Sequence, residues 1–323
     1  MQHYSLKNKL KILERFLSGY PVEKIILRYS IHKSTLYRWK KQFEFDQALG
    51  LKRRSRVGFI HPQKLSLVAT QKIIDFSITH PNLGPSSFAK ALSETGLNIS
   101  STTVYKLLTQ YNLRKETDRI YALEQRHIKE GLPISQDNFV LICKLNPCFK
   151  HYKEIGQYPG EILVQDTLRI SKHAETYYLY VVIDTYSFYS FISVAEEMSA
   201  DIAIDLLSRK TLRFFRENGC SVNTILTSKR PEFTKFNQRY NQFLADNNIS
   251  RKVFSDKSRN WHGYIETIKR YFIEHNKEYA ALDSSARLKA IKSSFRYINK
   301  KNKKGFPTFG KSPLTIMSNY LEK

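Results

Sequence analysis

The apolar pattern of the chain changes type at Gly160. Before this residue, apolar side chains recur at helical spacing in several separate segments. After it, runs rich in β-branched and aromatic residues predict strands over residues 162–164, 177–184 and 189–194. Segments of the two types then alternate, with helices at 200–217 and 233–247, strands at 224–227 and 251–254, and a last helix containing Glu266. This order predicts an α/β domain that follows an all-α N-terminal half.

Residues 1–50 predict a small helical domain. Apolar residues at helical spacing begin at Leu6, Pro21 is well placed to start a second helix, and a third begins near Lys33. A short helix, a turn and a basic helix form a helix-turn-helix, whose last helix enters the major groove of DNA. The candidates for base contacts stand at the start of that helix: Lys33, Ser34, Thr35, Tyr37 and Arg38. An ordinary helical bundle with a solvated basic face is the alternative interpretation.

Residues 64–115 predict a second helix-turn-helix domain. A helix is expected over about 65–79, another begins near Phe88 and ends at Gly96, and a third has Ser100 as its N-cap. On this third helix, the candidates for DNA contact are Ser101, Thr102, Thr103 and Lys106.

The remaining segments outside the α/β domain are connectors. Residues 51–63 form a basic run containing Arg53, Arg54 and Arg56. Such a run is usually a solvated linker, but between two DNA-binding units it can equally follow phosphates or enter a minor groove. Residues 116–158 predict a helical connector, and residues 281–323 predict a C-terminal helical extension with a basic tail.

The charge of the chain indicates its partner. Lys and Arg total 53 against 29 Asp and Glu, which gives a formal net charge of +24. So large an excess repels itself in a compact protein, so a polyanion is the expected partner. We expect no membrane partner, because the sequence has no apolar run of ~18 residues and no signal-peptide pattern. Cys143, Cys148 and Cys220 form no disulfide framework, as in a reducing cytoplasm.

Three segments of the α/β domain carry residues of catalytic type. Residues 160–167 (GEILVQDT) contain Asp166, residues 225–233 (ILTSKRPEF) contain Ser228, and residues 260–266 (NWHGYIE) end in Glu266. Together these segments resemble the catalytic core of retroviral-integrase-type (DDE) transposases and integrases, whose middle motif reads Thr-Asp-Asn-Gly-x-Glu-Phe. The Asp, Asn and Gly of that motif stand in this sequence as Ser228, Lys229 and Arg230.

The resemblance implies a fold and a metal-dependent chemistry. It implies a ribonuclease-H-like integrase core over residues 159–280, preceded by the two all-α helix-turn-helix domains, and it extends to residues 311–314 (KSPL). In this family two Mg²⁺ (or Mn²⁺) ions roughly 4 Å apart, held by carboxylates, promote attack on a phosphodiester. Asp166 and Glu266 match the catalytic and metal-binding acids of the motif, and Ser228 occupies the place of the middle Asp.

The altered middle motif predicts that strand transfer is impaired or lost. It also predicts a Mg²⁺ or Mn²⁺ cofactor if the site is active, and no cofactor if it is not. A serine hydroxyl does not replace the charge of a carboxylate, and Lys229 and Arg230 add positive charge beside the expected cation site. Other acids that could supply the third carboxylate are Asp184, Glu232 and Asp256. The plain role of Asp184 is to cap a turn, and the glutamate of the family motif is not a metal ligand. In a site without metal, Asp166 and Glu266 would be leftover solvated carboxylates.

DNA binding does not depend on these acids. Basic residues around Glu266 are predicted to hold the DNA backbone: Lys257, Arg259, Lys269 and Arg270. The resemblance further implies double-stranded DNA with terminal inverted repeats as the partner, a homo-oligomer on DNA, and a bacterial cytoplasmic, nucleoid-associated location. A non-catalytic regulator or an inactive remnant derived from a transposase is the alternative. An RNA-binding protein is disfavoured because the sequence lacks an RNA-recognition signature.

Overall fold

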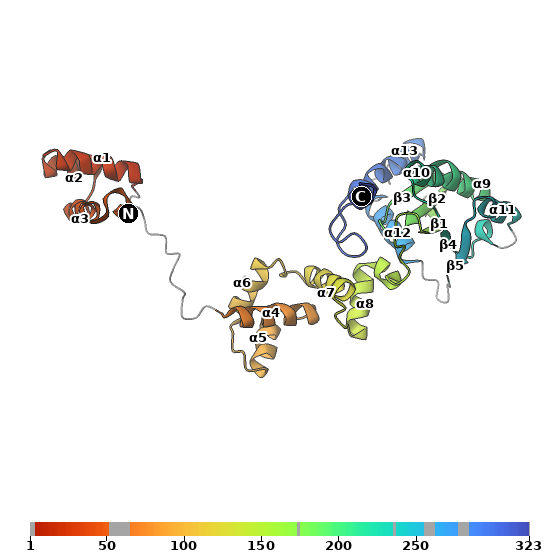
Figure 1. The fold of residues 1–323 in the computed structure, drawn as a ribbon, viewed down its shortest axis with the longest axis horizontal. Coiled ribbons are helices and arrows are strands. Elements are labelled where there is room, and N and C mark those ends of the chain that lie inside the picture. The colour runs from red at the N-terminus through yellow and green to blue at the C-terminus, as the bar shows by residue number, and fades with distance from the viewer. Residues whose placement is uncertain are drawn as a thin grey trace. The chain divides into compact units, whose positions relative to one another are not determined.

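The computed structural model describes residues 4–51, 65–172, 175–234, 237–254, 262–276 and 284–322. The chain divides into two compact units, residues 1–66 and residues 67–323, which we describe separately (Figure 1). Some residues discussed above lie outside the described part, namely Arg53, Arg54, Arg56, Asp256, Lys257 and Arg259.

The first unit contains the three predicted helices, α1 (Leu6–Leu17), α2 (Val22–Tyr29) and α3 (Lys33–Gly50). The turn between α2 and α3 contains Ser30, which adopts the left-handed conformation with φ 46° and ψ 45°. This conformation reverses the chain sharply and is usually left to glycine. The helices enclose one apolar core, made by Ile12, Leu13, Ile25, Ile31, Leu36, Trp39 and Leu51.

The second unit begins with three further helices, α4 (Leu67–Thr79), α5 (Pro85–Glu94) and α6 (Ser101–Gln110). The predicted cap at Ser100 is confirmed, because its hydroxyl accepts a hydrogen bond from the Thr103 backbone N–H at 3.2 Å. Gly96 follows α5 with a φ of +81°, as expected of a residue that ends a helix. The helix expected from Phe88 begins three residues earlier, because Pro85 is well suited to the first turn.

The predicted connector is helical and packs against α4–α6. It consists of α7 (Glu116–Glu130), α8 (Gln136–Leu145) and a 3₁₀ helix, η1 (Pro147–His151). The buried Arg119 of α7 joins this segment to the preceding helices by donating hydrogen bonds to the carbonyl oxygens of Pro81, Leu83, Leu113 and Arg114.

A five-stranded mixed sheet forms the centre of the α/β part. Its strands lie in the order β3-β2-β1-β4-β5, with β1, β2 and β3 antiparallel and with β4 and β5 parallel to β1. This order confirms the ribonuclease-H-like fold. The bounds are β1 (Ile162–Lys172), β2 (Glu175–Asp184), β3 (Ser190–Ala195), β4 (Thr224–Thr227) and β5 (Ser250–Val253).

Helices cover both faces of this sheet (Figure 1). Alternate residues of a strand point to opposite faces. Thus Val181 and Ile183 of β2 pack in one core with α12 (Gly263–Asn276) and α13 (Ser284–Ser294), whereas Tyr180 and Val182 pack in the other core. That second core includes residues of α9 (Ala200–Asp205), the π-helical segment Leu206–Leu212, α10 (Arg213–Glu217), α11 (Gln238–Asp246) and α14 (Pro313–Leu321). No helix of the described segments is long and apolar enough to cross a bilayer.

Two sequence predictions about this domain are wrong in extent. The first strand was expected over residues 162–164, but β1 continues to Lys172, because the residues after Asp166 pair with β2 along its whole length. The helix expected over residues 233–247 starts only at Gln238, where Asn237 caps it, and Pro231–Phe233 form a 3₁₀ turn instead. Asp166 therefore lies within a strand, and not at its end.

A buried acid joins the connector to the C-terminal segment. Glu124 of α7 is fully buried, and its Oε1 accepts hydrogen bonds from Asn146 Nδ2 at 2.6 Å and from the Phe306 backbone N–H at 3.0 Å. Its Oε2 has no hydrogen-bond partner. Burial raises the pKa of Glu124 from 4.5 to about 7, although both hydrogen bonds oppose this change.

We expect the stability of the protein to report this pKa. A carboxyl group with a raised pKa holds its proton more tightly in the folded state, so its ionisation lowers the free energy of unfolding as pH rises from 4.5 towards 7 and above. Glu124→Gln removes this effect. In urea denaturation, the free energy of unfolding of the variant, relative to that of the native protein, should increase by about 3 kcal/mol between pH 4.5 and pH 8. The exposed Glu116→Gln should show no such gain, and equal gains in both variants would contradict the assignment.

Candidate functional site

Asp166 is buried beside the chain segment that follows β4. Because β4 pairs in parallel with β1, with Thr227 opposite Gln165, the residue after the strand lies next to Asp166. Ser228 Oγ donates a hydrogen bond to Asp166 Oδ1 at 2.6 Å, and the Thr167 backbone N–H donates another at 2.8 Å. Arg230 Nε lies 3.3 Å from the same oxygen. Two of the residues that replace the middle motif, Ser228 and Arg230, are thus direct partners of Asp166.

The surroundings of Asp166 determine the pKa of its carboxyl group. Its side chain is 1% exposed, and burial raises its pKa to about 6, although Ser228, the Arg230 guanidinium and the Thr167 N–H oppose the change. The charge of Glu232 raises the pKa further. The alternative in which Asp166 is a solvated carboxylate is therefore wrong.

Glu232 is a second buried acid near this position. It lies in the 3₁₀ turn Pro231–Phe233, is 3% exposed, and has no hydrogen-bond partner at either carboxyl oxygen. Asp184, by contrast, caps the turn after β2, as predicted. It accepts hydrogen bonds from Gly160 N, Ser187 N and Ser187 Oγ. Of the alternative acids in the described part of the chain, Glu232 is the one with unpaired oxygens.

Glu266, on the first turn of α12, lies among cations. Lys150 Nζ is 2.9 Å from its Oε2, and Arg270 Nη2 is 2.5 Å from its Oε1. Although burial opposes it, these two cations together lower the pKa of Glu266. Arg270 also donates to the Lys144 carbonyl oxygen at 2.7 Å. Arg270, which was predicted to bind DNA phosphate, therefore already has two partners within the protein, Glu266 and the Lys144 carbonyl oxygen.

These residues do not fit a magnesium site in this arrangement. Mg²⁺ requires a nearly octahedral set of oxygen ligands, and two such ions require several clustered carboxylates. Asp166 Oδ1 is instead occupied by Ser228, Thr167 and Arg230, and Glu266 is paired with two cations. Neither acid belongs to a group of three or more metal-type ligands among the residues that the structure describes.

The candidate DNA-contacting residues of the first unit lie at the start of α3. Thr35 is half-buried, whereas Lys33, Ser34, Tyr37 and Arg38 are exposed. His32 caps the helix, since its Nδ1 accepts from the Ser34 backbone N–H at 3.3 Å. The first turn of α3 thus presents polar and basic side chains on a fixed backbone.

The candidates on α6 and α12 differ in exposure. Thr102 and Lys106 are exposed, whereas Ser101 and Thr103 are half-buried. The Thr103 hydroxyl lies 2.9 Å from the hydroxyl of the cap residue Ser100 and so belongs to the cap. Lys269 is half-buried on α12.

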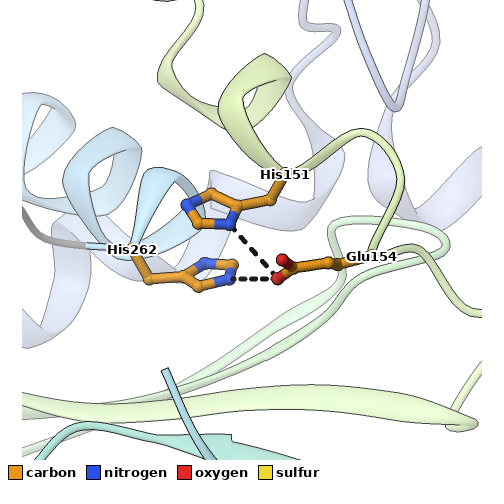
Figure 2. A group of neighbouring side chains, drawn as sticks. All are labelled: His151, Glu154 and His262. Carbon is orange, nitrogen blue, oxygen red and sulfur yellow. Dashed lines mark hydrogen bonds and ion pairs between the residues drawn. The ribbon is translucent and has the colours of Figure 1, made fainter. Parts of the chain in front are cut away.

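One group of side chains was missed by the sequence interpretation. His151, Glu154 and His262 each place a ligand-type atom within 4.8 Å of the others (Figure 2). Cys148 is not part of this group, since its Sγ contacts Thr267 Oγ1 at 3.3 Å and Gly263 O at 3.8 Å. No local motif announces the cluster, because His262 lies far along the chain from the other two residues.

Comparisons with known proteins give one family match and several similar solved structures. Residues 3–52 match the homeodomain-like domain family. No curated protein matches the chain. Among solved structures, one chain of the simian T-cell lymphotropic virus intasome in complex with PP2A regulatory subunit B56 gamma has a TM-score of 0.41 and 17% identity, over 50% of this chain and 56% of that chain.

Two structures of isolated integrase catalytic core domains also cover 50% of this chain. The HTLV-2 integrase catalytic core domain in complex with magnesium has a TM-score of 0.39 and 21% identity, and covers 50% of this chain and 99% of that chain. The BIV integrase catalytic core domain has a TM-score of 0.37 and 18% identity, over 50% of this chain and 95% of that chain. The ribonuclease-H-like assignment itself rests on the strand order and pairing described above.

Proposed function

We propose that this protein is a double-stranded-DNA-binding member of the retroviral-integrase-type (DDE) transposases, with strand transfer impaired or lost. The observation that carries the proposal is the arrangement at Asp166, where Ser228 and Arg230 occupy Oδ1, one of the two carboxylate oxygens through which this residue could hold a catalytic metal. The homeodomain-like domain, the ribonuclease-H-like core and the net charge of +24 support binding to DNA. If the site retains activity, Asp166 and Glu266 hold Mg²⁺ or Mn²⁺ with a third ligand, for which Glu232 is the candidate.

The target and assembly belong to the same proposal. Two helix-turn-helix units in tandem suit the terminal inverted repeats of a mobile element, with α3 and α6 in the major groove. Joining two DNA ends requires two copies of the protein in one assembly, so a homo-oligomer on DNA is expected. A nucleoid-associated location in a bacterial cytoplasm follows from that partner.

A non-catalytic regulator is the second candidate, and the Arg230–Asp166 pair favours it as well. A protein that holds transposon ends without joining them blocks or represses the active enzyme. Genomic context separates the two candidates. A transposase that has recently lost activity is still flanked by its own terminal inverted repeats, whereas a retained regulator is not.

DNA binding by the first unit predicts a specific mutational effect. Arg38→Ala removes an exposed cation at the start of α3. We expect fluorescence anisotropy to show duplex binding weakened by about tenfold, with the salt dependence of log K reduced by about one unit if Arg38 contacts a phosphate. Lys7→Ala, which removes an equal charge from an exposed position on α1, should have a smaller effect. Equal losses in the two variants would contradict α3 as the recognition helix.

The proposed loss of activity is tested with a cut terminal-repeat substrate and Mn²⁺ or Mg²⁺. We expect DNA binding without joined products. Joined products that disappear in Asp166→Ala would overturn the inactivity and would leave the DNA-binding proposal intact.

A further inference from the structure

The cluster of His151, Glu154 and His262 combines three residues from two distant segments. His151 ends η1, Glu154 lies in the turn after it, and His262 directly precedes α12. His151 Nδ1 is 3.3 Å from Glu154 Oε2, and His262 Nε2 is 3.9 Å from the same oxygen. Figure 2 shows the two imidazole rings lying one above the other, with Glu154 beside both of them. The ring centroids are 3.7 Å apart.

His262 is the unusual member of this cluster. Its side chain is 0% exposed, yet neither ring nitrogen makes a hydrogen bond of normal length, and the ion-pair partner of Nε2 is Glu154 Oε2 at 3.9 Å. A buried polar group without a partner costs about 1–3 kcal/mol, so native proteins rarely leave one unexplained. Each imidazole can offer the lone pair of one ring nitrogen to a metal ion.

The ligand-atom distances are close to those of a small tetrahedral ion, but the two stacked rings must turn so that a nitrogen of each points at the same ion. Zinc lies about 2.0–2.2 Å from nitrogen and oxygen ligands, so tetrahedral ligand atoms are roughly 3.3–3.6 Å apart. The His151–Glu154 distance already has this value. The His262–Glu154 distance of 3.9 Å must shorten by about 0.5 Å. Glu154 is 58% exposed and so is able to move.

We propose that His151, Glu154 and His262 form a binding site for a divalent transition metal of the zinc class, distinct from the acids Asp166 and Glu266. Two imidazoles and one carboxylate are a ligand set typical of zinc sites that keep one position open. All three ligands line a cleft of about 720 Å³, together with residues of β4 and β5 and the segment after β5. The ion would tie η1 to the start of the helix that carries Glu266.

The surrounding charges define which ions the site accepts. Lys150, Lys153 and Lys252 line the same cleft and oppose cation binding. Lys150, however, is paired with Glu266. A hard ion such as Mg²⁺, which depends on anionic oxygens, is excluded by this balance, whereas zinc-class ions gain from the imidazole nitrogens. An anion in the open position would be stabilised by the lysines.

The proposal is tested on the full chain, stripped with a chelator and titrated with Co²⁺ as a spectroscopic probe. We expect one Co²⁺ per chain with the visible absorption of a four-coordinate site, displacement by Zn²⁺ but not by excess Mg²⁺, and a higher melting temperature with Zn²⁺. Glu154→Gln and His151→Gln should each weaken Co²⁺ binding at least about tenfold. Because both side chains reach the solvent, we expect these variants to fold, which circular dichroism will check.

His80→Gln is the matched control and should bind Co²⁺ like the native chain. His80 is an exposed histidine outside the cluster. The proposal is overturned if no Co²⁺ binds, if the two cluster variants retain native affinity, or if a thiolate charge-transfer band shows that cysteines are the ligands.

Discussion

The triple variant Ser228→Asp, Lys229→Asn, Arg230→Gly should bind Mg²⁺ or Mn²⁺ at least about tenfold more tightly than the native protein. The change restores a carboxylate beside Asp166 and removes two positive charges, one of which lies 3.3 Å from Asp166 Oδ1. Without Arg230 and the Ser228 hydroxyl, that oxygen keeps only the hydrogen bond from the Thr167 backbone N–H and can also bind a cation. Isothermal titration calorimetry measures the gain directly.

The sequence offers a matched control for this variant. Ser208, Arg209 and Lys210 have the same three residue types, in the π-helical segment between α9 and α10. Ser208→Asp, Arg209→Gly, Lys210→Asn therefore produces the same change in net charge away from Asp166. It should leave metal affinity nearly unchanged. Equal metal affinities of the native protein and the 228–230 variant would count against local inactivation.

Gly263→Ala should lower the free energy of unfolding by about 3 kcal/mol or more. Gly263 begins α12 at the point where this helix touches η1. A Cβ atom at this position would lie 2.0 Å from the Pro147 carbonyl oxygen and 2.6 Å from its carbon, so α12 and η1 must move apart. Denaturation with urea measures the loss. The same shift would disturb the Lys150–Glu266 pair, which joins the two elements.

Gly84→Ala is the control for this prediction. Gly84 caps α5 with an ordinary φ of −85°, and an added Cβ would meet nothing within 4 Å. We expect a loss of no more than about 1 kcal/mol there. If Gly263→Ala is no more destabilising than Gly84→Ala, the close approach of α12 to η1 is not required for folding.

The sequence predicted the order of the core elements well, because each strand carries a strong local pattern. The strand at Thr224–Thr227 has the predicted bounds. The prediction failed for the length of one strand and for the start of one helix. β1 extends to Lys172 because β2 supplies a partner along its length, and Pro231–Phe233 form a 3₁₀ turn despite the helical pattern that follows.

The site was predictable only in part, for a similar reason. The resemblance to the family motif placed Ser228 near Asp166, and the parallel pairing of β1 with β4 brings the two residues together. The opposing charge of Arg230 was also expected, but its direct contact with Asp166 depends on the folded loop. The pairing of Glu266 with Lys150, and the cluster of His151, Glu154 and His262, join segments more than 100 residues apart, so no local pattern could indicate them.

A crystal of the protein soaked in manganese tests the inferred state of the Asp166 site most directly. We expect Arg230 Nε to remain beside Asp166 Oδ1, and we expect no anomalous scattering peak between Asp166 and Glu266. Two manganese ions bound between these acids, with Arg230 displaced, would contradict it.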